Sequence, residues 1–289
     1  MLRRALLAGG GALAATSRAR AVTPVPFGFR GALRQGGWMV VRTTPHGRVR
    51  VDRTIETRAG PGGEAVLGFD RDAARDTYVE VETAQGWRGQ AFPITAETYD
   101  VQRIDGLPAD QVEPSDPALL ARIASQLKRK QAALASADDM EGFAGAWRSP
   151  LPGAVRTSHF GPQRILNGVP KTPHYGVDLA APAGTPILAP AAGLVVLAEP
   201  AMHFEGGLTL VDHGQGLVSM YLHQSRLDVS AGRRVRAGET IGRVGATGRA
   251  TGPHLCWRMT WRGRHMNPAL WLAASGRDFS AAGARIFNL

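Results

Sequence analysis

The chain has 289 residues, 44% of them hydrophobic, and at about 100–200 residues per domain this length allows two domains with ordinary cores. Lys and Arg exceed Asp and Glu by ten, but four arginines lie in the first 21 residues, so the rest of the chain carries an excess of about six. This excess is spread along the chain and is almost all arginine. A solvated basic surface explains it, and we expect no nucleic-acid binding.

The first 21 residues have the features of an export signal. Arg3 and Arg4 precede a short apolar stretch rich in Ala and Gly, and Ala19-Arg20-Ala21 matches a small-residue cleavage site. The apolar stretch is far shorter than the ~20 residues that a membrane helix needs, so we expect no stable membrane anchor. The sequence therefore predicts a signal peptide at 1–21 and a periplasmic protein. An uncleaved leader is the alternative, and the export route stays open.

Residues 22–110 predict a small N-terminal β-sandwich-like domain. Short runs of β-forming residues at 38–41, 49–51, 78–82 and from 94 onward alternate with glycine-rich turns. The aromatic side chains expected in its core are Trp38, Phe69, Trp87 and Phe92. Carbohydrate binding by these aromatic residues is the alternative interpretation.

Residues 111–146 predict a helical connector. Apolar residues recur at helical spacing over 119–127, Ser115 or Asp116 can cap the helix, and Pro117 suits its first turn. We expect this helix to end near Ala137.

Residues 147–272 predict a compact antiparallel β domain, followed by a C-terminal tail at 273–289. Candidate strands between glycine turns lie at 186–189, 193–197, 208–211, 217–222, 240–244 and 254–259. The whole chain is therefore expected to be mainly β, with a small N-terminal β domain and a connecting helix before the larger β domain.

Three histidine-bearing segments stand out in the second domain. They are His174-Tyr175-Gly176-Val177-Asp178, Tyr221-Leu222-His223 and His254-Leu255-Cys256. Residues two apart in a strand face the same side, so His254 and Cys256 can point into one cleft. His174 and Asp178 converge only if their segment bends.

The only cysteine of the chain is notable in an exported protein. A lone cysteine in an oxidising compartment is usually buried, reactive or bound to something. A hydrolytic zinc site needs about three N, O or S ligands and an open position, and His174, Asp178 and Cys256 supply one of each. His223 and His254 would remain for proton transfer. A buried hydrophobic role for Cys256 is the alternative.

Residues 157–270 resemble the catalytic domain of LytM- and lysostaphin-type zinc metalloendopeptidases, which cleave peptide bonds in peptidoglycan. The matching segments, in the order of that family, are Ser158-His159-Phe160-Gly161 with Arg164, the HxxxD motif at 174–178, Ala181 to Ile187, Asp212-His213-Gly214, Tyr221-Leu222-His223, Val235 to Gly242, and Gly245 to Leu255. The resemblance implies a LytM-type catalytic fold.

The resemblance also implies roles for single residues. His174 and Asp178 match two zinc ligands, whereas His223 and His254 match catalytic histidines. The family's third ligand is the second histidine of an HxH motif, and Cys256 holds that place here. One Zn²⁺ bound by His174, Asp178 and Cys256 is therefore expected. Thiolate in place of imidazole lowers the summed charge of the zinc site from plus one to about zero, which predicts a higher pKa of bound water and a more alkaline pH optimum.

The function expected from these residues is that of a periplasmic zinc metalloendopeptidase that hydrolyses peptide cross-links of peptidoglycan, with its stem peptides as substrate. Loss of the second HxH histidine keeps a second hypothesis open, in which a catalytically degenerate LytM-type domain binds and activates a cell-wall amidase. A third hypothesis is a cysteine hydrolase that uses Cys256 with His254 or His223.

Overall fold

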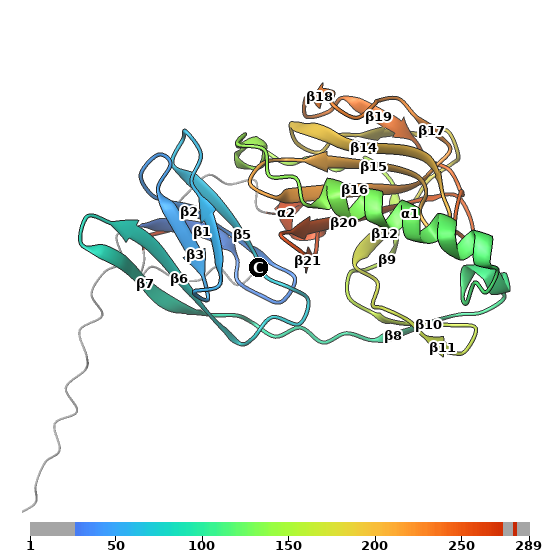
Figure 1. Cartoon of the computed structure of the whole chain (residues 1–289), viewed down its shortest axis with the longest axis horizontal. Helices are drawn as coiled ribbons and strands as arrows, with labels where there is room; N and C mark the ends of the chain where they lie inside the picture. Colours follow the sequence, from blue (N-terminus) through green and yellow to red (C-terminus); the bar gives the residue numbers. More distant parts are fainter. Residues whose placement is uncertain (1–26, 274–279, 282–289) are drawn as a thin grey trace, which may run out of the picture.

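The computed structural model describes residues 27–273 and 280–281. In this part of the chain the fold is mainly β with antiparallel sheets, which confirms the predicted fold class. Figure 1 shows a smaller β-rich part formed by the first strands beside a larger one, with helix α1 (Pro117–Leu134) lying across the larger part. The predicted signal peptide at 1–21 lies outside the described residues.

The N-terminal part forms two four-stranded antiparallel sheets within the described residues, in the orders β22-β1-β2-β5 and β4-β3-β6-β7. The strands are β1 (Gly28–Ala32), β2 (Trp38–Arg42), β3 (Arg48–Val51), β4 (Ile55–Arg58), β5 (Glu64–Gly68), β6 (Asp76–Thr83), β7 (Gly86–Pro93) and β22 (Ser280–Ala281). Alternating valines such as Val49 and Val81, which are directly paired, point into the core.

The aromatic core predicted for this part is correct except for Trp87. Trp38, Phe69 and Phe92 are buried. Trp87 is half-exposed on β7, and the guanidinium groups of Arg48 and Arg50 lie over its ring at 5.2 and 4.1 Å. The indole thus contributes a cation–π surface rather than core volume.

The larger part is built on an eight-stranded antiparallel sheet in the order β18-β14-β15-β16-β20-β12-β9, with β21 also paired to β20. Its strands are β9 (Val155–Ser158), β12 (Gly176–Ala180), β14 (Gly193–Met202), β15 (Gly206–Asp212), β16 (Leu217–Gln224), β18 (Arg234–Val235), β20 (His254–Trp261) and β21 (Arg264–Met266). Every residue of β15 and β16 is buried, so both faces of the sheet are covered.

Different elements cover the two faces of this sheet. Apolar side chains of the three-stranded sheet β13-β19-β17, such as Ile187 and Ile241, belong to one core with Val211 and Trp257. Ala133 of α1 belongs to a second cluster on the main sheet. The covering strands are β13 (Pro186–Leu188), β17 (Arg226–Leu227) and β19 (Thr240–Arg243).

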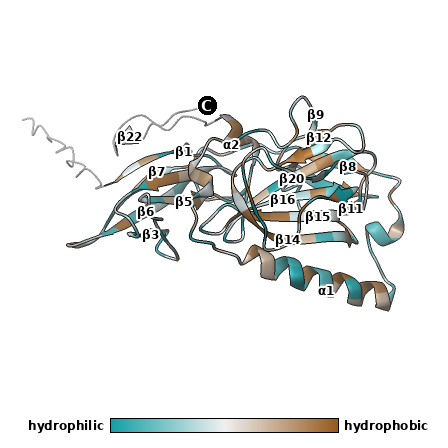
Figure 2. Cartoon of the chain, turned by 90° about the horizontal axis from the view of Figure 1, so that it is seen from above, coloured by the Kyte–Doolittle hydropathy of each residue, from teal (hydrophilic) through white to brown (hydrophobic). Residues whose placement is uncertain are grey.

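Helix α1 begins as predicted and ends three residues earlier, at Leu134. Asp116 Oδ1 accepts a hydrogen bond from the Leu119 amide at 2.7 Å and caps the helix, with Pro117 in the first turn. The helix is more than a connector, because it lies beside β14 (Figure 2). Gln126 donates a hydrogen bond to the Ala201 carbonyl, and Arg129 pairs with Glu199, both on β14. Among the described helices, none is long and apolar enough to span a membrane.

Two short segments cross the predicted domain boundaries. Strand β8 (Val101–Ile104) lies in the range assigned to the N-terminal domain but pairs in parallel with β10 (Gln163–Leu166), which also pairs with β11 (Val169–Pro170). Strand β22 lies in the predicted tail at 273–289 but pairs with β1. The expected strand from 94 begins only at Val101. The boundaries at 110, 146 and 272 stay predictions.

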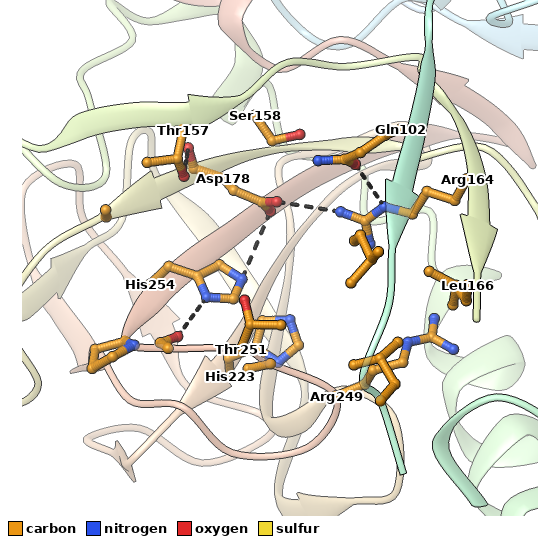
Figure 3. Close-up of a pocket in the computed structure, with 16 residues that line it drawn as sticks. Gln102, Thr157, Ser158, Arg164, Leu166, Asp178, His223, Arg249, Thr251 and His254 are labelled. Atoms are coloured by element: carbon orange, nitrogen blue, oxygen red, sulfur yellow. Dashed lines mark hydrogen bonds and ion pairs between the residues drawn. The ribbon is translucent and has the colours of Figure 1, made fainter. Parts of the chain in front are cut away.

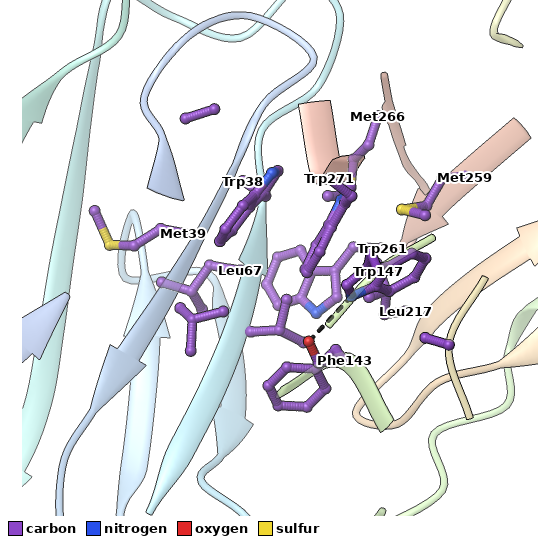
Figure 4. Close-up of a cluster of buried hydrophobic side chains, with 14 of the residues drawn as sticks. Trp38, Met39, Leu67, Phe143, Trp147, Leu217, Met259, Trp261, Met266 and Trp271 are labelled. Carbon is purple, nitrogen blue, oxygen red and sulfur yellow. Dashed lines mark hydrogen bonds between the residues drawn. The ribbon is translucent and has the colours of Figure 1, made fainter. Parts of the chain in front are cut away.

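A tryptophan cluster joins the two parts of the chain (Figure 4). Trp38 of β2 stacks on Trp271 of α2 (Ala269–Ala273) with ring centroids 4.2 Å apart, and Trp147 lies 4.7 Å from Trp271. Trp147 follows the 3₁₀ turn Gly142–Ala144 and donates its indole N–H to the Phe143 carbonyl at 3.1 Å. The two parts therefore share one continuous apolar core.

Removal of the Trp38 ring should destabilise the whole described fold. We expect Trp38→Ala to lower the free energy of unfolding by about 3–5 kcal/mol, because the buried indole leaves a large cavity in the shared core. Denaturant unfolding measures this loss, with the half-exposed Trp87→Ala as the matched control. Equal losses for the two variants would contradict the shared core.

Candidate metal centre and its cleft

The pairing of β12 with β20 positions the candidate site. Asp178 lies opposite Cys256, and Ala180 lies opposite His254. Because side chains alternate along strands, Asp178, His254 and Cys256 share one face of the sheet. Gly176 allows this close pairing, since a Cβ there would lie 2.7 Å from Arg258 Cγ and 2.8 Å from the Trp257 carbonyl oxygen.

The three predicted metal ligands converge. His174 lies just before β12, and its Nε2 is 3.1 Å from Asp178 Oδ1 and 3.4 Å from Cys256 Sγ. The three ligand atoms all lie within 4.8 Å of one another, and all three residues are buried. The bend expected between His174 and Asp178 is therefore present.

The donor atoms of this cluster fit a divalent cation. Asp178 Oδ1 is buried and has no hydrogen-bond partner among the described residues. His174 Nδ1 lies 3.2 Å from the His159 carbonyl oxygen and 3.1 Å from Ser158 Oγ. A proton on Nδ1, donated to that carbonyl, leaves the Nε2 lone pair facing the other two donors. One nitrogen, one oxygen and one sulfur donor is a set that suits zinc.

Two arginines contact this cluster. Arg164 Nη2 donates to Asp178 Oδ2 at 3.3 Å, and Arg258 Nε donates to Cys256 Sγ at 3.3 Å. Burial by itself would raise the pKa of Asp178, but nearby His174 and Arg164 outweigh it and hold that pKa well below its usual range. Asp178 is therefore ionised at any working pH.

Arg258 was missed by the sequence reasoning. It lies two residues after Cys256 on the same strand, so strand alternation alone would have placed its side chain beside the sulfur. Zinc, the Asp178 carboxylate and the Cys256 thiolate sum to about zero, so Arg258 brings the charge to about plus one, and Arg164 beside Asp178 adds another positive charge. The alkaline shift expected from the ligand set alone is therefore opposed by a neighbouring cation.

The two predicted catalytic histidines lie side by side at the cleft. The ring centroids of His223 and His254 are 4.7 Å apart, and His254 Nε2 is 3.9 Å from Asp178 Oδ1. Each Nδ1 contacts a backbone carbonyl at 2.8 Å, that of Thr247 for His223 and that of Gly252 for His254. Each Nδ1–H can donate there, which leaves both Nε2 atoms as proton acceptors (Figure 3).

The protonation of these imidazoles suits general base chemistry. Burial lowers the pKa of His223 to about 4, and burial also lowers the pKa of His254 below its ordinary value. Both rings are therefore neutral near pH 7. His223 also has a positive φ of 65°, a strained conformation for a non-glycine residue that re-aims its ring at the end of β16.

The cleft beside these histidines has a volume of about 370 Å³. Its lining includes Asp178, His223 and His254 but not Cys256, which is 1% exposed. The sulfur lies between the donors of His174 and Asp178 on one side and apolar neighbours such as Leu222 on the other. A nucleophilic cysteine must reach its substrate, so this burial argues against the cysteine hydrolase hypothesis.

His213 lies outside the cleft lining. It is fully buried, and its two ring nitrogens contact the Ala192 carbonyl oxygen at 2.8 Å and Ser219 Oγ at 2.7 Å. Burial lowers the pKa of His213 to about 4. The ring is thus a neutral, hydrogen-bonded part of the core.

Acid should destabilise the fold through the buried histidines whose pKa is lowered, such as His213 and His223. An unfolded histidine has a pKa near ~6.5, so between about pH 6.5 and 4 the unfolded chain binds more protons than the folded one. The free energy of unfolding should therefore fall with pH, by up to about 1.4 kcal/mol per pH unit for each such group. Denaturant unfolding at pH 7, 6 and 5 should show a shallower dependence for His213→Gln than for the wild type. The exposed His159→Gln is the control, and equal slopes for His213→Gln and wild type would contradict the account.

Comparisons with known proteins show which family this chain is similar to. Residues 172–268 match the sequence model of Peptidase family M23. Peptidoglycan DD-endopeptidase ShyC of Vibrio cholerae is 42% identical over 123 residues, which are 42% of this chain and 28% of that protein. Peptidoglycan DD-endopeptidase ShyA of the same organism is 40% identical over 113 residues, 38% of this chain and 26% of that protein.

A solved structure from Pseudomonas aeruginosa extends the similarity beyond the cleft. That chain, described as a peptidase M23, is 31% identical with a TM-score of 0.64, and the match covers 84% of this chain and 96% of the other. In contrast, the chain spans only about a quarter of the length of the two curated Vibrio relatives. The similarity to the solved chain therefore includes much of the N-terminal part as well as the cleft.

Proposed function

The chain belongs to peptidase family M23, and from that premise we propose that it is a zinc metalloendopeptidase that hydrolyses peptide cross-links of peptidoglycan. The observation that carries the proposal is the convergence of His174, Asp178 and Cys256 beside two neutral imidazoles in an open cleft. The names of the Vibrio relatives support peptidoglycan as the substrate. The export-signal features of residues 1–21 support a periplasmic location.

The three ligand atoms define which residues would hold the metal ion. His174 Nε2, Asp178 and Cys256 Sγ would hold one zinc ion, which when bound supplies a Lewis acid that polarises a peptide carbonyl and acidifies water. Arg164 and Arg258 hold the carboxylate and the sulfur in place through their hydrogen bonds. The Asp178 oxygen without a partner is thereby kept for the metal.

The imidazoles of His223 and His254 at the cleft are placed for proton transfer. The Nε2 atoms of His223 and His254 are free of protons when each Nδ1–H bonds its carbonyl. They can therefore accept a proton from the attacking water and return it to the leaving amine. Since burial lowers the pKa of both rings below the ordinary histidine value, both are neutral at physiological pH and this capacity is present there.

Metal analysis tests the ligand set directly. We expect purified full-length protein to bind one Zn²⁺ per chain, and Cys256→Ala and Asp178→Asn to bind it much more weakly because each loses one of three donors. Cys256→His, which exchanges one zinc ligand for another, should retain the metal. Mass spectrometry and competition with a chromogenic chelator measure this. Full zinc retention by Cys256→Ala would contradict the assignment.

Substitution of the cleft histidines should separate catalysis from metal binding. We expect His223→Ala and His254→Ala to lower kcat on purified cross-linked peptidoglycan by about 10²–10⁴-fold while zinc stays bound, because they lose proton transfer and not a ligand. Chromatography of the released peptides measures cleavage, and His159→Ala is the control because its side chain is exposed. A folded, zinc-loaded wild type that cleaves nothing but stimulates an amidase would instead support the amidase-activating hypothesis.

A further inference from the structure

One arginine that lines the cleft has no carboxylate to balance its charge among the described lining residues. Of the described residues that line it, Asp178 is the only carboxylate, whereas Arg164 and Arg249 are both cationic. Asp178 already faces Arg164 at 3.3 Å and His174 at 3.1 Å. The positive charge of Arg249 is therefore not balanced by any carboxylate in the lining.

The surroundings of Arg249 hold its side chain and leave most of its donors unused. Its Nη1 donates to the Gln111 carbonyl at 3.1 Å, and its Cζ lies 5.0 Å from the centroid of the Phe204 ring. No ion pair involves Arg249 among the residues described here. A guanidinium has five N–H donors, so four of them have no acceptor in this part of the protein.

The position of Arg249 is both preorganised and electrostatically unfavourable without an anion. Its backbone N–H bonds the Phe204 carbonyl at 2.9 Å, which fixes the start of the loop that leads to His254. Burial, followed by repulsion from Arg258 and Arg164, lowers the pKa of Arg249 below its ordinary value, and the smaller attraction of Glu205 and Cys256 does not offset this. Because arginine still keeps its proton, a bound anion would relieve this repulsion.

We propose that Arg249 is a specificity-determining residue that binds a free carboxylate of the peptide substrate. This inference rests on the proposed endopeptidase function and adds a subsite to it. In Figure 3, Arg164 and Arg249 lie on the other side of the cleft from His254, so the carboxylate belongs to a part of the substrate next to the cleaved bond and not to the reacting carbonyl. A planar guanidinium binds carboxylate through two parallel hydrogen bonds.

A competing explanation is that Arg249 only ties its loop to the 3₁₀ turn η1 (Ala109–Gln111). The hydrogen bond to the Gln111 carbonyl uses a single N–H of Arg249, and a lysine could form it as well. Carboxylate binding needs the planar fork as well as the charge. Arg249→Lys and Arg249→Met therefore distinguish a structural tie from a binding site.

The experiment compares three forms of one cross-linked stem peptide. The first has all carboxylates free, the second is amidated only at side-chain carboxylates, and the third only at C-terminal carboxylates. We expect zinc-loaded wild type to lose about 10–100-fold in kcat/KM when the recognised carboxylate is amidated, the range for a charge-assisted bond. The form that loses activity identifies which carboxylate Arg249 binds.

The variants connect this discrimination to Arg249. Arg249→Met should lower kcat/KM for the free acid to the level of the amidated peptide, mainly through KM, and Arg249→Lys should fall between. Arg156→Met, an exposed arginine on β9, is the matched control. Binding of the same peptides to His223→Ala, measured by calorimetry, gives a readout that needs no turnover.

The outcomes separate the subsite from the function. Equal cleavage and equal binding of all three peptides by wild type would overturn the subsite and leave the proposed function standing. If no peptide is cleaved, the function fails, and calorimetry still decides the subsite. If Arg249→Met loses thermal stability and weakens all three peptides by the same factor, Arg249 is a structural tie and the proposal is wrong.

Discussion

The candidate site depends on the register between β12 and β20. Because side chains alternate along a strand, a slip of one residue would turn Asp178 to the opposite face from Cys256 and separate the donors. β20 is held between β12 and β16, and its apolar residues are buried in the main sheet. Gly176 allows the close approach at the start of the pairing. The packing of a whole sheet thus fixes the positions of three ligand atoms.

The loops around the sheet fix the protonation of the histidines. His174, His223 and His254 each place Nδ1 against a backbone carbonyl, at 3.2, 2.8 and 2.8 Å, and these carbonyls come from two loops, one after β9 and one between β19 and β20. Each contact selects the tautomer with a lone pair on Nε2. Burial then holds His223 and His254 neutral. The same chemical group therefore serves as a ligand in one place and as a proton acceptor in two others.

Sequence reasoning succeeded where the determining interactions are local. The helix cap at Asp116, the strand at 254–259 and the shared face of His254 and Cys256 follow from neighbouring residues and strand alternation. Contacts between distant segments were not predictable in this way. The pairing of β8 with β10 and the stack of Trp38 on Trp271 depend on which segments the whole fold brings together. The same holds for Arg249, which has no carboxylate partner within residues 27–273 and 280–281.

Zinc binding by Cys256 is the central claim. Its sulfur is buried against apolar side chains as well as beside the ligand atoms of His174 and Asp178, so packing alone could also explain its position. X-ray absorption at the zinc edge of the purified full-length protein tests it most directly. The account predicts one sulfur neighbour at ~2.3 Å together with nitrogen and oxygen neighbours at ~2.0–2.2 Å. Bound zinc with only nitrogen and oxygen neighbours would contradict it.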